Sequence, residues 1–169
     1  DVATPSTKIK DKTTDFSELN IVNTGTLTDA ESITLFGPEF AAVMGPLYVF
    51  AEHTTTEVKR TAAQDLTFSG WHAAAAWSLT GETRADAYRM SSGEFKGLRP
   101  NKHFDWANGG FGAWEIAARY AEIDLNDADV VGGEEDALSV ALNWYPNRNV
   151  RIMADWSRIL NTDESNQIR

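Results

Sequence analysis

The sequence predicts an all-β protein built from long antiparallel strands. Three observations support this prediction. From Ile33 onward, apolar and polar residues alternate mostly with a period of two, short turn sequences join several alternating runs, and many of the runs are about ten residues or longer. Strands of soluble sheets more often have about five or six residues. Long alternating runs joined by tight turns therefore indicate long antiparallel hairpins.

The first thirty residues are the least regular part of the chain. They are rich in Thr, Ser and Asp and lack helical periodicity, so we expect a loop with a short strand at 19–22. Two strands are then expected at about 33–44 and 47–60, joined by a turn at Gly45-Pro46. Their alternation is less clean than that of the later runs.

The clearest alternation lies in four later segments. They are "SGWHAAAAWSLTGE", "GAWEIAARYAEI", "DALSVALNWY" and "NVRIMADWSR". In the first, one parity holds Trp71, Ala73, Ala75 and Trp77, whereas the other is small or polar. A helix is the alternative for "GAWEIAARYAEI", because Ala, Glu and Arg favour helices. We predict a strand because the neighbouring segments share its alternation and its placement of aromatic residues.

The connections between these strands differ in length and charge. A tight turn is expected at "PNRN" (146–149), and longer loops are expected at the acidic segment 124–136 and at about 81–111. Antiparallel strands alternate in direction, which places the 81–111 connection at the same end as Gly45-Pro46 and "PNRN". That end otherwise has short turns.

The 81–111 connection also reverses the sign of the chain's charge. The protein has a formal net charge of −10, yet residues 83–104 hold five basic residues against two acidic ones, a net +3. Such a segment is either a solvated loop face or a site that attracts anions. Its stretch "FKGLRPNKHF" (95–104) carries three of the basic residues.

Composition excludes several classes of function. One short basic stretch in an acidic chain argues against nucleic-acid binding, since phosphate contacts need a broad basic surface. The absence of Cys excludes disulfides, thiol nucleophiles and Cys-based zinc sites. His53, His72 and His103 lack metal-ligand spacing, and no constellation of residues indicates catalysis, so we predict neither enzyme activity nor a cofactor. The longest apolar runs are too short for a transmembrane helix.

The apolar face of the strands can point into a sandwich core or outward into lipid. Lipid is favoured because the opposite face is often Ala and Ser with isolated charges, which suits a crowded lumen. Several Trp residues also fall on the apolar parity, as in the aromatic belts of membrane proteins. The alternative is a soluble β-sandwich that binds a ligand or a partner.

Four segments together resemble the carboxy-terminal half of the phosphate/polyphosphate-selective porins of Gram-negative outer membranes. They are "FSGWHAAAAWSLTGE", "FKGLRPNKHF", "GAWEIAARYAEIDLND" and "GGEEDALSVALNWYPNRNVRIMADW", in that order, and the resemblance covers residues 31 to about 160. It implies a sixteen-stranded antiparallel transmembrane β-barrel, usually a homotrimer, in contact with outer-membrane lipid and lipopolysaccharide. Residues 1–169 would form part of that single barrel domain and supply about six or seven strands. The chain begins without Met or a signal peptide and ends without a final amphipathic strand, so we expect a piece of a larger chain.

The resemblance implies a lumen whose Arg and Lys residues pass small anions such as inorganic phosphate or polyphosphate. Our candidate path residues are Arg84, Arg89, Lys96, Arg99 and Lys102 on the connection, with Arg119 and Arg151 on inward strand positions. The alternative for the last two is pairing with Glu115 or Asp155. The rival function is a general or differently selective porin, because the inward positions carry both signs of charge.

The acidic segment 124–136 permits a second site. Its carboxylates could hold a divalent cation between the protein and lipopolysaccharide. The alternative is an ordinary hydrated external loop, and the spacing of its acidic residues is not that of an EF-hand.

Overall fold

The computed structural model describes residues 6–11 and 22–163. Within them the fold is almost entirely β, with one short 3-10 helix, η1 (Arg84–Ala87). The strands are β1 (Lys10–Asp11), β2 (Val22–Asn23), β3 (Ala30–Phe36), β4 (Glu39–Met44), β5 (Leu47–Arg60), β6 (Leu66–Ser78), β7 (Tyr88–Arg89), β8 (Glu94–Phe95), β9 (Ala113–Asp127), β10 (Val130–Asn147) and β11 (Val150–Asp163). In the described ranges, no helix is long and apolar enough to cross a membrane.

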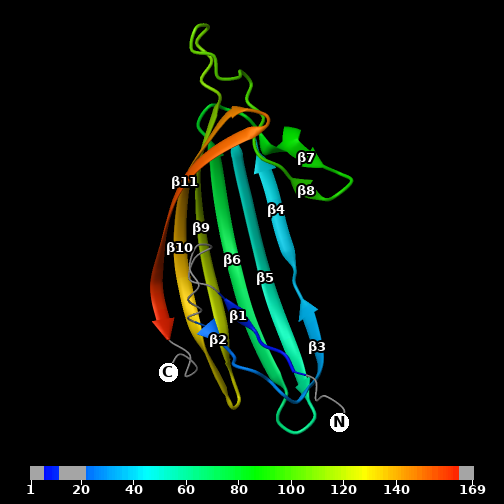
Figure 1. Ribbon diagram of the computed structural model, residues 1–169. Coiled ribbons are helices and arrows are strands. Elements are labelled where there is room, and N and C mark those ends of the chain that lie inside the picture. Colours follow the sequence, from blue (N-terminus) through cyan, green and yellow to red (C-terminus); the bar gives the residue numbers. More distant parts are fainter. Residues whose placement is uncertain (1–5, 12–21, 164–169) are drawn as a thin grey trace.

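One antiparallel sheet organises the described residues (Figure 1). Its strand order is β11-β10-β9-β6-β5-β3, and β4 continues the edge beside β5. The five long strands have 13 to 18 residues each, more than the 9–11 that a transmembrane strand needs. The predicted all-β antiparallel architecture is therefore confirmed, and the sheet is open at both edges.

The edge next to β5 differs from its prediction. The sequence predicted one strand at about 33–44, whereas the structure has two strands separated by Gly37 and Pro38. Proline lacks a backbone N–H and cannot donate to the ladder, so the pairing breaks there. The Pro38 carbonyl still accepts a hydrogen bond of 3.1 Å from the His53 N–H. Of the short strand expected at 19–22, only Val22 is described, and it begins β2; the remainder lies outside the described residues.

The acidic segment 124–136 is also shorter as a loop than predicted. β9 runs to Asp127 and β10 starts at Val130, so only Ala128 and Asp129 form the turn. Ala128 has a positive φ of 49°, the left-handed conformation that tight hairpins require. The acidic residues lie on two paired strand ends because charged side chains are tolerated where strands extend into water.

The turns alternate between the two ends of the sheet. The turns at Gly45-Pro46 and at 148–149 lie at the upper end in Figure 1, and the segment between β6 and β9 lies there too. Gly45 has a φ of +58°, which suits glycine in a tight turn. The long connection joins β6 to β9 and contains η1, β7 and β8.

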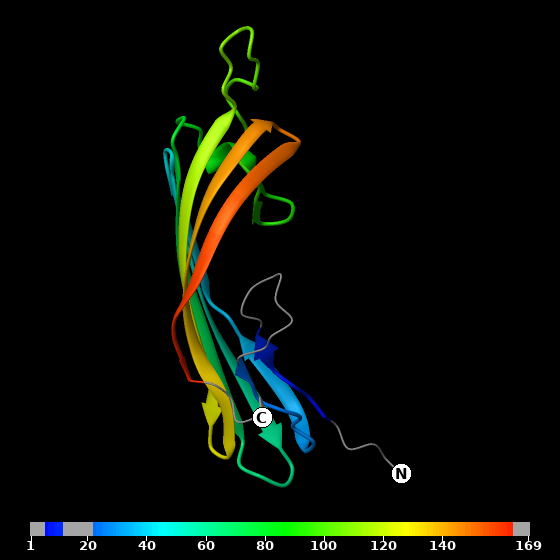
Figure 2. The ribbon, with the colours of Figure 1, turned by 60° about the vertical axis from the view of Figure 1, so that its left-hand side comes forward.

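The two faces of the sheet differ as the alternation predicted. Large apolar side chains on one face are exposed, and they include Trp71, Trp77, Ile116, Val140, Leu142, Ile152 and Trp156. The sheet curves, and β1-β2 and the part of the connection that contains η1, β7 and β8 lie on its concave side (Figure 2). We call this concave side the inner face and the apolar side the outer face.

Buried apolar residues gather at two places on the inner face. Near the lower end in Figure 1, β2 packs on the sheet, and Val22, Val58, Leu66, Phe68 and Leu125 form one cluster with their neighbours. Near the upper end, Leu98 of the connection packs with Ala113 and Tyr145. The inner face is therefore covered near both ends by segments that are not part of the main sheet.

Candidate channel constriction

The connection begins with a buried carboxylate that joins its two arms. Glu82, four residues after the end of β6, is 4% exposed and accepts hydrogen bonds from Ser78 Oγ (2.9 Å), Thr80 Oγ1 and the backbone N–H of Asn101 (3.2 Å). Burial raises the pKa of this carboxyl, but the hydrogen bonds outweigh burial and lower the pKa below its ordinary value. The ionised carboxylate therefore closes residues 82–101 into a loop.

The loop has local structure of its own. Thr83 caps η1, since its hydroxyl accepts a hydrogen bond of 3.3 Å from the Ala85 N–H. After η1 the chain forms the small hairpin β7-β8, and the Lys96 N–H donates to the Ala87 carbonyl at 3.2 Å. The connection is thus a folded insert, which we call the 82–101 insert.

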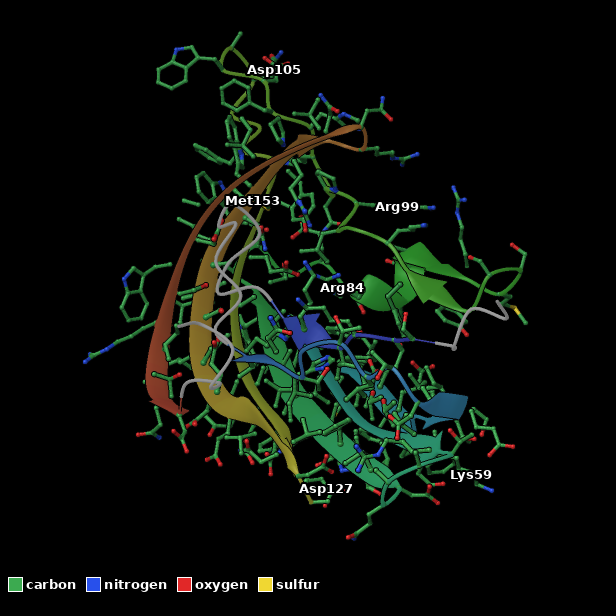
Figure 3. All side chains as sticks on the ribbon, turned by 60° about the horizontal axis from the view of Figure 1, so that its bottom comes forward. Lys59, Arg84, Arg99, Asp105, Asp127 and Met153 are labelled. Atoms are coloured by element: carbon green, nitrogen blue, oxygen red, sulfur yellow. The ribbon has the colours of Figure 1, made fainter. Side chains whose placement is uncertain are left out.

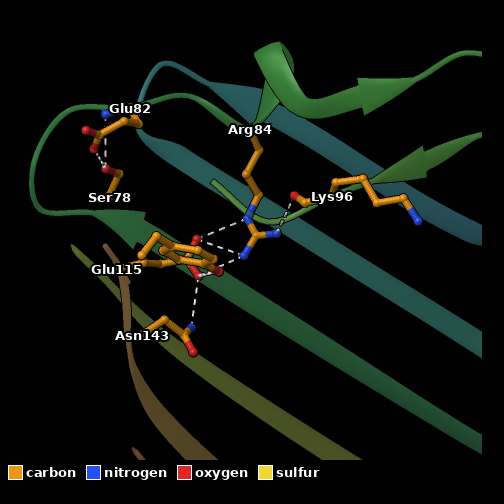
Figure 4. A network of polar contacts seen from close by, with 7 residues as sticks. Ser78, Glu82, Arg84, Lys96, Glu115 and Asn143 are labelled. Atoms are coloured by element: carbon orange, nitrogen blue, oxygen red, sulfur yellow. Dashed lines mark hydrogen bonds and ion pairs between the residues drawn. The ribbon is translucent and has the colours of Figure 1, made fainter. Parts of the chain in front are cut away.

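An ion pair attaches the insert to the sheet (Figure 4). Arg84 Nη2 lies 2.8 Å from both carboxylate oxygens of Glu115, and Arg84 Nε lies 3.1 Å from Oε2. Glu115 is on the inward parity of β9 and is 1% exposed. Asn143 Nδ2 (3.0 Å) and the Tyr145 hydroxyl (3.4 Å) also donate to Glu115 Oε1. Such multidentate, charge-assisted contacts are the strong class of hydrogen bond.

Apolar and aromatic contacts surround the ion pair. The Arg84 guanidinium lies 4.9 Å from the centroid of the Tyr48 ring on β5, and Tyr48 contacts Phe95 of the insert at 5.2 Å between centroids. On the other side, a Cβ added at Gly97 would lie 2.8 Å from the Tyr145 ring. Only glycine fits between the insert and β10 at that point without a shift.

The basic residues predicted from the sequence occupy different environments. Arg84 is paired with Glu115, and the Lys96 carbonyl accepts from Arg84 Nη1 at 3.4 Å. Arg89, Arg99 and Lys102 are exposed. In Figure 3, Arg84 lies inside the curve of the sheet, whereas the Arg99 side chain extends away from the strands.

Arg119 and Arg151 lie on inward parity of β9 and β11 and are both exposed. Arg151 lies beside the Tyr145 side chain. Sequence reasoning offered Glu115 as a partner for these two arginines, but the structure pairs Glu115 with Arg84. The sequence analysis missed both the Arg84–Glu115 pair and the buried Glu82. One signal could have indicated the pair: Glu115 is a carboxylate on the inward parity of a strand that faces the basic connection.

A hollow of about 900 Å³, lined by both polar and apolar side chains, lies on the inner face. Its lining carries both signs of charge, and its polar members include Glu52, Thr54, His72, Arg119, Ser139 and Asp155. In the part of the chain that is described, no cluster of three or more His, Asp or Glu side chains could hold a metal ion. The arrangement can therefore hold water and ions beside fixed charges, with the basic insert near one end.

An antiparallel sheet with an apolar outer face, a charged inner face and an insert folded onto that inner face defines a segment of a porin. Comparisons with known proteins identify which porins. Residues 10–168 match the family described as phosphate-selective porin O and P. The chain therefore belongs to this family of porins.

Two relatives illustrate the membership. An uncharacterised protein of Caulobacter vibrioides is 36% identical over 135 residues, which cover 80% of this chain and 26% of the relative. Porin O of Pseudomonas aeruginosa is 31% identical over 132 residues, which cover 72% of this chain and 28% of that porin. The chain thus spans about a quarter of the length of these relatives.

Proposed function

We propose that the protein forms a passive outer-membrane channel for small anions, with inorganic phosphate or polyphosphate as its physiological cargo. The observation that carries this proposal is the attachment of the basic connection to the inner face through Arg84 and Glu115. An anion channel needs fixed positive charge in a narrow passage, spread over several groups so that the ion can also leave. The insert supplies such groups on the side of the sheet that faces away from lipid.

The proposed path runs over exposed basic groups of the connection and then over the inner face. Arg89, Arg99 and Lys102 would attract an anion near the insert, and Arg151 and Arg119 would receive it along the strands. An arginine guanidinium suits oxyanions because its planar fork donates two parallel hydrogen bonds. Lysine contributes a point charge.

The rival is a general or differently selective porin. It is favoured by the acidic residues of the inner face, since Glu52 and Asp155 line the same hollow as Arg119. A soluble β-sandwich has no such support, because large apolar side chains of the outer face are exposed and no second sheet covers them in the described ranges. The same proposal assigns the outer face to lipid and lipopolysaccharide and, from the family resemblance, the assembly to a homotrimer.

Reversal potentials of the full chain in planar bilayers test the proposal. Under a KCl gradient, we expect a reversal potential of the sign set by chloride permeation, and added inorganic phosphate or polyphosphate should reduce the chloride current by competing for the basic groups. A cation-preferring potential contradicts the anion proposal. A weak preference with no effect of phosphate or polyphosphate supports the general porin instead.

A further inference from the structure

Glu115 is an unusual residue on the inner face. It is 1% exposed, whereas Arg119 and Asp155 on the same face are exposed. A buried carboxylate is unfavourable unless it is paired and hydrogen-bonded. Glu115 meets this condition only through residues of other segments: Arg84 of the insert and Asn143 and Tyr145 of β10.

Arg84 contacts both the sheet and the returning arm of the insert. Its Nε and Nη2 donate to Glu115, and its Nη1 donates to the Lys96 carbonyl on the returning arm of the insert. One guanidinium therefore joins both arms of the insert and the sheet. Its positive charge is also compensated by a carboxylate at 2.8 Å, so it adds little to the field that a passing anion meets.

We propose that Arg84 and Glu115 are positioning residues of the channel: their ion pair holds the 82–101 insert on the inner face and thereby places Arg89 and Arg99 along the ion path. The inference rests on the proposed function for its effect on anions. The attachment itself is a separate claim, because it concerns where the insert lies in any channel that this chain forms.

The proposal predicts a shift in ion selectivity opposite in direction to the shift that the loss of one charge alone would cause. Replacing Glu115 by Gln removes one negative charge from the inner face, which alone would raise the preference for anions. If the ion pair positions the insert, the same change releases it, widens the passage and moves its basic groups away from the path. Conductance then rises and anion preference falls.

Asp155→Asn is the matched control. It removes one carboxylate from the same face, but Asp155 is exposed and lies on β11 rather than against the insert. We expect it to leave the insert attached and to raise anion preference. The two isosteric changes of equal charge should therefore shift the reversal potential in opposite directions.

Limited trypsin digestion of the full chain, folded in lipid vesicles, reports attachment without reference to anions. Cleavage after Arg89 or Lys96 requires the insert to open, and its rate follows the population of the open form. For Glu115→Gln we expect cleavage there to be faster by about tenfold or more, because breaking a buried ion pair is strongly unfavourable. Asp155→Asn should match the parent, with fragments identified by mass spectrometry.

Arg84→Gln provides a second variant from the other side of the pair, in case Glu115→Gln does not fold as judged by heat-modifiable migration. A tether supplies the rescue: the chain has no Cys, so Leu98→Cys and Ala113→Cys, which belong to one buried cluster, can be joined by a short bismaleimide. The tethered Glu115→Gln protein should regain the parental conductance.

The outcomes separate the two claims. The positioning role is overturned if Glu115→Gln and Arg84→Gln are cleaved at the parental rate and the reversal potential of Glu115→Gln shifts in the same direction as that of Asp155→Asn. Faster cleavage and higher conductance in a channel that prefers cations would retain the positioning role and overturn the anion function.

Discussion

The carboxylate of Glu82 accepts a hydrogen bond of 3.2 Å from the backbone N–H of Asn101, 19 residues farther along the chain. The contact joins the first and last residues of the insert. Ser78 and Thr80 donate to the same carboxylate, so its ionised form is satisfied despite burial. Closure of the insert is therefore linked to the protonation of one side chain.

This linkage predicts a pH dependence. Because the pKa of Glu82 is lowered in the folded state, its stabilising contribution is present above the unfolded value of about 4.3 and is lost as the pH falls through the folded value. We expect hydrogen-exchange protection of the Asn101 amide, corrected for intrinsic rates, to fall in that acidic range. Glu82→Gln should lack the transition, whereas Glu57→Gln, an exposed carboxylate of β5, should keep it. Equal protection of the parent on both sides of this range contradicts the linkage.

A second prediction concerns the exposed basic residues of the connection. Neutralising Arg99 and Lys102 together as Gln should move the reversal potential toward cations, because two fixed charges near the entrance are lost. The matched control is Lys59→Gln with Arg158→Gln. These residues have the same charges but lie on the outer parity of β5 and β11. If the reversal potential shifts equally in both double variants, the effect is due to net charge. Arg99 and Lys102 are then solvated loop residues without a role in selectivity.

The two faces of β10 give a third prediction. Val140 lies on the outer face and Ala141 on the inner face, one residue apart. Val140→Arg should lower the free energy of unfolding from lipid by about 2–4 kcal/mol, the cost of a lipid-facing charge near the bilayer midplane. Arg at 141 should cost less because it enters the aqueous side. Urea titrations in lipid vesicles measure both, and equal costs would contradict the assignment of the faces.

The strands were predictable from the sequence because their signal is local. In β6, β9 and β10, each residue's parity fixes the face on which it lies, and Gly45-Pro46 marks a turn without knowledge of the rest of the fold. The break at Pro38 has an equally local cause. It was missed because the apolar residues on both sides continue the run.

The acidic strand ends were missed for a related reason. Charged residues at 124–136 were taken to indicate a long loop, but the described strands extend past the apolar band, where alternation of hydrophobicity no longer marks a strand. The ion-pair partner of Glu115 could not be predicted from the local sequence. Arg84 is 31 residues away, on a segment without periodicity, and its choice over Arg119 depends on how the insert packs between Tyr48 and Tyr145.

The last prediction concerns the opposite end of the sheet, where Arg60 pairs with Asp129. The Arg60 side chain is 4% exposed, and it joins the end of β5 to the β9-β10 turn through two hydrogen bonds, of which Nη1 to Oδ2 is 3.1 Å. Hydrogen bonding to Arg60 lowers the pKa of Asp129, so this pair too stabilises the fold above the ordinary aspartate pKa and weakens as the pH falls through the lowered value.

Asp129→Asn should therefore lower the free energy of unfolding at neutral pH, because it removes a charged acceptor from the buried Arg60 guanidinium. Urea unfolding in lipid vesicles measures the change, and the difference from the parent should shrink in acid. Glu134→Gln removes an exposed carboxylate near the same end and should have little effect. If both variants unfold at the parental urea concentration, the pair is a surface contact without influence on stability, as many exposed ion pairs are.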